Sequence, residues 1–167
     1  MLWLGIVSVT AKNVSTPATG VVSEIVSALA RFGLAAVWIV SGWLKIADPV
    51  ATKQSVLAYE IFNAQISYLI ADILPPLEIA LGILLILGVF LRATGIVSAL
   101  IFVAFIGGIA SAWARGLTID CGCFGGGGYD ASVTGWTYFV EILRDIAFIA
   151  MAAWTAYRPF RRFAIYP

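Results

Sequence analysis

Four long apolar segments constrain the fold of this chain more than any other feature, and they cover about residues 24–46, 70–90, 94–113 and 133–157. A helix rises about 1.5 Å per residue, so about 20 apolar residues are enough to cross the hydrocarbon core of a bilayer. The chain is 62% hydrophobic and only 11% charged, whereas about a quarter of the residues of a soluble domain are charged. We therefore expect an all-α fold: a single membrane domain, built as an integral membrane four-helix bundle.

Polar segments flank and interrupt these spans. We expect a polar N-terminal arm over residues 1–20 and a basic C-terminal tail over residues 158–167. The apolar start has no basic residue before it, so it lacks the charged region of a signal peptide. Between the first two spans, Asp48 followed by Pro49 is typical of a helix start. The mixed residues 50–62 predict a short amphipathic helix at the membrane interface.

The distribution of basic residues predicts how the bundle is oriented. Four spans place both chain ends and the connection between the second and third spans on one side. That side has Lys12, Arg92, Arg158, Arg161 and Arg162, and the other side has Lys45, Lys53 and Arg115. Because basic residues accumulate on the cytoplasmic side, we expect cytoplasmic termini. The long loop between the third and fourth spans is then extracytoplasmic.

Residue types that are missing exclude several functions. The chain has no histidine, which excludes histidine-ligated haem, most zinc enzymes and catalytic Ser-His or Cys-His pairs. The net charge is +1 and no basic tract is present, so nucleic-acid binding is not expected. The chain has two cysteines, which allow one thiol–disulfide couple.

Three of the charged residues in the first two spans are candidate site residues. Lys45 ends the first span, and we expect its side chain to snorkel to the lipid headgroups. Arg31 lies deeper and is expected to pair with an acid inside the bundle. Glu78 follows Pro75 and Pro76, where we expect the second helix to open or restart. A carboxylate at that depth needs a partner or a proton.

The fourth span contains Glu141, Arg144 and Asp145, which lie within about one helical turn of one another. Two interpretations stay open for the charges inside the spans. They form buried ion pairs that stabilise the bundle, which is the favoured interpretation, or they carry protons coupled to thiol oxidation. Glu78 and Glu141 are the candidate proton carriers, since both fall in the outer half of their spans.

The loop before the fourth span contains both cysteines, Cys121 and Cys123, with a single glycine between them. A disulfide between them would close a small, strained ring that is easily reduced and adds little stability. The pair therefore suits exchange better than stapling, although a passive pair stays open. A metal site that adds Asp120 or Asp130 to the two thiolates is a third, less favoured interpretation. The glycines at 125–128 are expected to let the loop yield to an incoming protein.

Three stretches of this sequence resemble the MauE/DoxX superfamily of small four-helix membrane proteins. The stretches are Arg31 with Ser41-Gly-Trp-Leu-Lys-Ile-Ala-Asp-Pro49, then Leu74-Pro-Pro-Leu-Glu-Ile-Ala-Leu-Gly82, then Ile119-Asp-Cys-Gly-Cys-Phe-Gly125. The Cys-Gly-Cys-Phe-Gly motif points to the MauE side of the group. The resemblance implies a four-helix bundle in the bacterial cytoplasmic membrane.

The resemblance also implies a site and a set of partners. Carried over residue by residue, Cys121 and Cys123 would be the exchange pair, and Arg31, Lys45, Asp48 and Glu78 would be family positions. MauE is associated with disulfide formation beside a thioredoxin-like partner, and DoxX relatives with electron transfer to quinone. Four-helix disulfide enzymes of the vitamin K epoxide reductase type use two cysteine pairs, whereas this chain has one.

Two functions follow from these observations. The first is a thiol–disulfide redox protein that exchanges with an extracytoplasmic thioredoxin-like partner and passes electrons to a quinone. The second is a non-catalytic accessory subunit of a larger membrane complex, such as a respiratory one.

Overall fold

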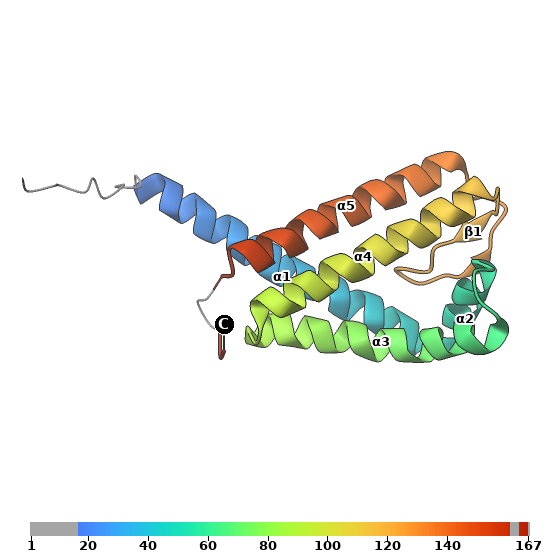
Figure 1. Cartoon of the computed structure of the whole chain (residues 1–167), viewed down its shortest axis with the longest axis horizontal. Helices are drawn as coiled ribbons and strands as arrows, with labels where there is room; N and C mark the ends of the chain where they lie inside the picture. The colour runs from blue at the N-terminus through green and yellow to red at the C-terminus, as the bar shows by residue number, and fades with distance from the viewer. Residues whose placement is uncertain (1–16, 161–163, 167) are drawn as a thin grey trace, which may run out of the picture.

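A computed structural model of the chain describes residues 17–160 and 164–166, which are mostly helical (Figure 1). Its helices are α1 (Pro17–Ala47), α2 (Pro49–Ala58), α3 (Ala64–Leu87), α4 (Leu91–Ala114) and α5 (Gly135–Tyr157). Two short strands, β1 (Ile119–Asp120) and β2 (Gly128–Tyr129), pair antiparallel within the cysteine loop. Residues 1–16 of the expected N-terminal arm lie outside the described residues, as do Arg161 and Arg162 of the expected tail.

Three of the helices are long and apolar enough to cross a membrane. They are α1 over Gly20–Ala47, α3 and α4, and they support the prediction of a membrane protein. Helix α5 is of similar length, with 23 residues. It differs because Glu141, Arg144 and Asp145 fall within its first half, and intramembrane charges are costly unless they are paired.

Local capping explains where α2 and α3 begin. The side chain of Asp48 accepts a hydrogen bond from the amide of Ala51 at 2.9 Å, and Pro49 opens α2. Asn63 caps α3 in the same way, by accepting from the amide of Ile66 at 3.0 Å. The second long helix therefore starts at Ala64, six residues before the expected span.

Helix α3 runs without a break through Pro75 and Pro76, where the sequence predicted an opening or a restart. The prolines lack the amide hydrogens that would bond to the carbonyls one turn earlier. Close packing supports this part of α3: a Cβ added to Gly42 of α1 would lie 2.8 Å from the carbonyl oxygen of Pro75. The small residue on α1 thus lets the proline turn of α3 approach it directly.

The core between the long helices is built around Trp38 of α1. Its ring is fully buried and stacks on Phe102 of α4, with 4.5 Å between the ring centroids. Its indole nitrogen donates to the hydroxyl oxygen of Ser98 at 2.9 Å, so its polar edge is also satisfied. Nearer the start of α4, a Cβ at Gly95 would come within 2.8 Å of the carbonyl of Ala152, so α4 and α5 pack closely.

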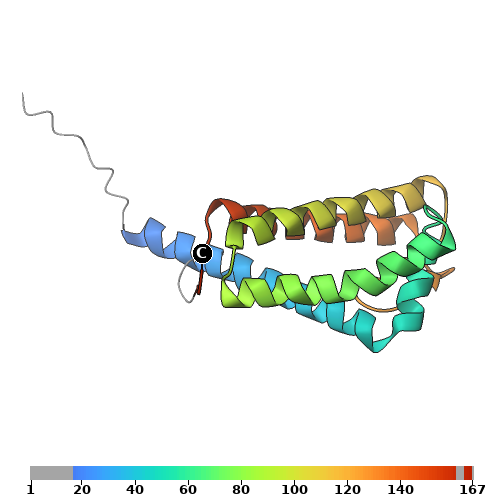
Figure 2. The ribbon, with the colours of Figure 1, turned by 60° about the horizontal axis from the view of Figure 1, so that its bottom comes forward.

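The two ends of the bundle differ in content. The start of α1, the end of α5 and the tight α3–α4 connection lie at one end, and α2 and the cysteine loop lie at the other (Figures 1 and 2). The tail returns to the first end, where the amide of Phe90 donates to the carbonyl of Tyr166 at 2.9 Å. All charged groups discussed next, except Arg31, belong to the α2 end.

Candidate functional site at the cysteine loop

The cysteine loop folds back onto α2, and glycines make this possible. A Cβ at Gly127 would collide with the hydroxyl of Ser55 and with the carbonyl of Ala51, and one at Gly122 would lie 2.6 Å from the Cβ of Ser55. Gly122 also has a φ of +67°, which residues with a side chain rarely adopt. Gly122 and Gly127 thus allow the loop to pack closely on α2. That the glycines at 125–128 let the loop yield to an incoming protein stays a prediction.

The short helix α2 presents a polar, small-residue face to this loop. Its buried residues are Thr52, Ser55 and Ala58. The hydroxyl of Ser55 lies 3.2 Å from the carbonyl of Gly126. The hydroxyl of Tyr59, just after α2, donates to the carbonyl of Cys121 at 3.3 Å. α2 therefore holds the cysteine segment through hydroxyl contacts to its backbone.

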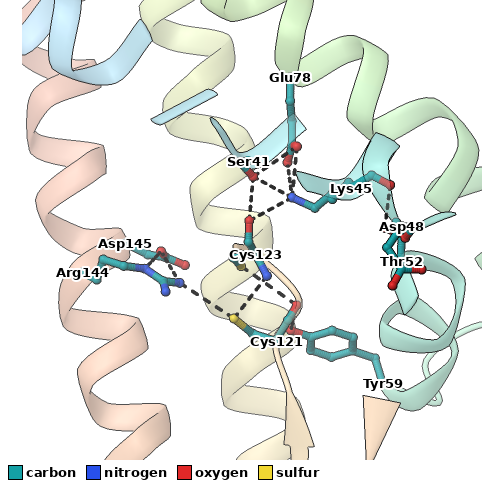
Figure 3. A network of polar contacts seen from close by, with 10 residues as sticks. All are labelled: Ser41, Lys45, Asp48, Thr52, Tyr59, Glu78, Cys121, Cys123, Arg144 and Asp145. Atoms are coloured by element: carbon teal, nitrogen blue, oxygen red, sulfur yellow. Dashed lines mark hydrogen bonds and ion pairs between the residues drawn. The ribbon is translucent and has the colours of Figure 1, made fainter. Parts of the chain in front are cut away.

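A buried ion pair holds the other side of the loop (Figure 3). The ammonium of Lys45 lies 2.9 Å from the carboxylate of Glu78, and the two side chains are only 6% and 0% exposed. The same ammonium lies 3.2 Å from the carbonyl of Cys123, which also accepts from the hydroxyl of Ser41 at 2.7 Å. α1 thus fixes the backbone of Cys123 directly, and Glu78 of α3 holds the two α1 side chains that do so.

The prediction that Lys45 snorkels to the headgroups is wrong. Its side chain turns inward because Glu78 supplies a counter-charge and because Ser41 and the Cys123 carbonyl satisfy its remaining donors. Ser41 lies four residues before Lys45, which places both on one face of α1. That spacing was the available signal for Ser41, which sequence reasoning missed.

Helix α5 supplies the charges around the sulfur of Cys121. The guanidinium of Arg144 lies 3.9 Å from Cys121 Sγ and pairs with Asp145 at 3.1 Å (Figure 3). It also lies over the ring of Phe124, 5.1 Å from the centroid. Arg144 therefore links the fourth long helix to the cysteine segment by both charge and stacking.

Two carboxylates beside this cluster keep an oxygen without a partner. Among residues 17–160 and 164–166, Glu141 Oε2 and Asp145 Oδ2 are buried and have no hydrogen-bond partner. One carboxylate oxygen each of Asp120 and Glu141 and the sulfur of Cys121 lie within 4.8 Å of one another. Asp130 is separate, because its carboxylate accepts from the amide of Ser132 at 2.8 Å. Glu141 is thus the acid best placed to take a proton from Cys121.

The two thiols have different acidities. Hydrogen bonding with the Cys123 thiol lowers the pKa of Cys121 to about 6, and the charge of Arg144 acts in the same direction. Hydrogen bonding to Cys121, together with burial, raises the pKa of Cys123 well above its ordinary value. The amide of Cys123 also points at Cys121 Sγ, at 3.5 Å. Because the thiolate is the nucleophile, Cys121 is the reactive member of the pair.

The other sequence candidates lie outside this cluster. Asp48 caps α2 at an exposed position, so its contribution is to the start of that helix. Arg31 lies at the opposite end of the bundle, where it donates to the carbonyls of Leu85, Ile86 and Phe160. The site therefore unites Lys45, Glu78, Asp120, Cys121, Cys123, Glu141, Arg144 and Asp145, and it adds Ser41, Ser55, Tyr59 and Phe124.

Comparison with known families identifies the protein class. The family model described as methylamine utilisation protein MauE matches residues 23–158. The chain belongs to the MauE family. The match includes every residue of the cysteine site, and it confirms the resemblance that the three sequence stretches indicated. Searches of curated proteins and of solved structures found no match. The protein is thus a membrane protein of the MauE family, a group compatible with a redox or an accessory role.

Proposed function

We propose that this protein is a membrane thiol–disulfide redox protein in which Cys121 and Cys123 cycle between dithiol and disulfide. The observation that carries the proposal is the position of Cys121, a half-buried residue whose sulfur lies beside Arg144 and Glu141. The same sulfur accepts a hydrogen bond from the amide of Cys123. Cationic surroundings and neighbouring donors are typical of reactive cysteines. The family match agrees with such a role.

The exchange partner is an extracytoplasmic thioredoxin-like protein. A thiolate of the reduced partner attacks Cys121 Sγ of the oxidised pair, the Cys121–Cys123 bond breaks, and the sulfur of Cys123 takes up a proton. The second partner thiol then displaces Cys121, so the partner leaves oxidised and both cysteines are reduced. Cys121 forms the mixed disulfide because Cys123 is buried, with 8% of its surface exposed. The two electrons then pass to a quinone, which regenerates the disulfide.

For this reaction we place α1, α3, α4 and α5 across the bacterial cytoplasmic membrane, with cytoplasmic termini and α2 at the outer interface. The charges of α5 support a fourth span because they face inward: Asp145 is 1% exposed, whereas Phe139, Leu143 and Ile146 are exposed. The buried acid and the paired Arg144 leave an apolar surface for lipid. The cysteine loop then faces the side where disulfides persist.

A trapping experiment tests this function. With the oxidised wild-type protein and a reduced thioredoxin-like protein that keeps only its attacking cysteine, a mixed disulfide through Cys121 should accumulate, since the partner has no second sulfur to displace Cys121. Cys121→Ser should accumulate none and should stop disulfide transfer. Undiminished transfer by Cys121→Ser would overturn the proposal.

The exposed aromatic residues Phe124, Tyr129 and Trp136 beside the loop favour a second candidate, an accessory subunit of a larger membrane complex. In that case mild-detergent purification yields a stoichiometric complex, and Cys121→Ser leaves its assembly and activity intact.

A further inference from the structure

A cavity of about 240 Å³ lies next to the cysteine pair, between α2, α3, α4 and the loop. Its walls are mostly apolar, and they include Tyr59, Phe62, Leu74, Ala104, Phe105 and Gly108. Cys121, Gly122 and Cys123 form the wall on the loop side, and Lys45 of α1 also lines the cavity. A cavity that brings apolar walls and both cysteines together suits an apolar molecule that reacts with thiols.

The size and shape of the cavity fit one substituted ring. An apolar cavity of about 150 Å³ in another protein binds a benzene molecule, so the larger volume here leaves room for ring substituents. The ring of Tyr59 lies directly over α4 at Gly108, where an added Cβ would be 3.3 Å from it. Tyr59, Phe62 and Phe105 therefore offer aromatic faces against which a flat ring stacks.

The cavity opens toward the apolar surface of the bundle. Ala104, Ile61 and Phe62 all line it and are all exposed. α3 ends and α4 begins at their tight connection, and Figure 1 shows the two helices diverging from there toward the α2 end. With α3 and α4 in the membrane, a lipid-soluble molecule reaches the cavity from the hydrocarbon side without passing through water.

We propose that this cavity holds the ring of a membrane quinone and brings it against the sulfurs of Cys121 and Cys123. This inference rests on the proposed function and names the place where that function obtains its oxidant. Oxidation of the pair breaks both S–H bonds and forms one S–S bond. The two electrons and two protons that leave the sulfurs reduce one quinone to one hydroquinone, so the reaction balances.

Groups of this chain supply what the oxidation needs. Glu141 Oε2, which lacks a partner among the described residues, accepts the proton of Cys121. Lys45, whose ammonium is paired with Glu78, lines the cavity and holds the carbonyl of Cys123 beside it. Tyr59 keeps the Cys121 backbone at the wall through its hydrogen bond to the carbonyl.

The test uses the full chain in lipid nanodiscs, with decylubiquinone as oxidant and an azido-ubiquinone analogue as photolabel. Labelling should fall on the peptides that contain Tyr59 and residues 104–108, and excess decylubiquinone should displace it. Ala104→Phe fills the cavity and should weaken both labelling and thiol oxidation about tenfold, a loss of about 1.4 kcal/mol in binding. Ala110→Phe makes the same change at an exposed position of α4 outside the cavity, and it should behave as wild type.

Each outcome decides between the two proposals. Exchange of Cys121 with a thioredoxin-like partner should persist in Ala104→Phe, which separates the cavity from the exchange site. Labelling elsewhere, displacement by oleate alone, or equal losses in both phenylalanine variants would overturn the quinone site and leave the exchange function standing. If the wild type neither exchanges with the partner nor reacts with quinone, both proposals fail. Leu74→Phe, on the opposite wall, repeats the test if Ala104→Phe does not fold.

Discussion

The two ends of the bundle use buried positive charge in different ways. At the tail end, Arg31 is fully buried and its three nitrogens donate to carbonyls of Leu85, Ile86 and Phe160 at 2.7 to 2.8 Å. Two of these carbonyls belong to the last turn of α3, where helix carbonyls lack partners within the helix. Arg31 therefore completes the end of α3 and ties the C-terminal segment to it.

At the cysteine end, positive charge surrounds a reactive group. Lys45 holds the carbonyl of Cys123, and Arg144 lies beside the sulfur of Cys121. Here Glu141 Oε2 and Asp145 Oδ2 have no partner in the described part of the chain. The contrast shows that burial of a charge does not by itself mark a functional site. A buried charge marks a functional site when a nucleophile and a proton acceptor lie beside it.

The largest effect on stability is expected at Glu78, at the cysteine end of the bundle. Glu78→Gln leaves the ammonium of Lys45 buried without its counter-charge, and we expect a loss of about 3–5 kcal/mol in the free energy of unfolding. Thermal unfolding in nanodiscs measures the loss. The double variant Lys45→Met with Glu78→Leu removes both charges and should recover most of the stability. A Glu78→Gln protein as stable as wild type would contradict a structural ion pair.

At the opposite end, Arg31→Lys keeps the charge but loses the planar fork that reaches three carbonyls. We expect a loss of about 1.5–3 kcal/mol in stability, the value of one charged hydrogen bond. The alkylation rate of Cys121 should not change, because Arg31 lies at the other end of the bundle. A slower alkylation rate in this variant would show that the two ends are coupled.

A smaller effect is expected at Arg144. Arg144→Gln removes the cation beside Cys121 and should raise the pKa of that thiol from about 6 toward its ordinary value. Alkylation of Cys121 by iodoacetamide should then slow several-fold near pH 7. It should reach the wild-type rate at alkaline pH, where the Cys121 thiol is ionised in both proteins. Lys53→Gln, which changes a cation of exposed α2 surface, is the matched control. Identical pH profiles for wild type and Arg144→Gln would remove Arg144 from the site.

The smallest effect belongs to a surface ion pair. Lys53 and Asp72 pair at 3.0 Å with side chains 39% and 58% exposed. Asp72→Asn should cost less than about 1 kcal/mol, because water screens exposed pairs. A loss as large as that of Glu78→Gln would show that burial does not explain the difference between the two pairs.

Much of the helical architecture could be predicted from the sequence because the apolar segments are long and strongly patterned. The α2 start at Asp48–Pro49 was equally clear, since capping chemistry is local. The inward turn of Lys45 could not be predicted, because its partners Glu78 and Cys123 lie on other segments. Tyr59 was missed for the same reason: only the folded loop brings the Cys121 carbonyl to its hydroxyl.

A redox titration of the full chain in nanodiscs, with glutathione buffers and alkylation before mass spectrometry, tests the cysteine pair itself. We expect one two-electron transition, in which a peptide containing both thiols converts reversibly to one containing a Cys121–Cys123 disulfide. Thiols that stay reduced across the whole range, or that pair only between molecules, would contradict a redox function for this site.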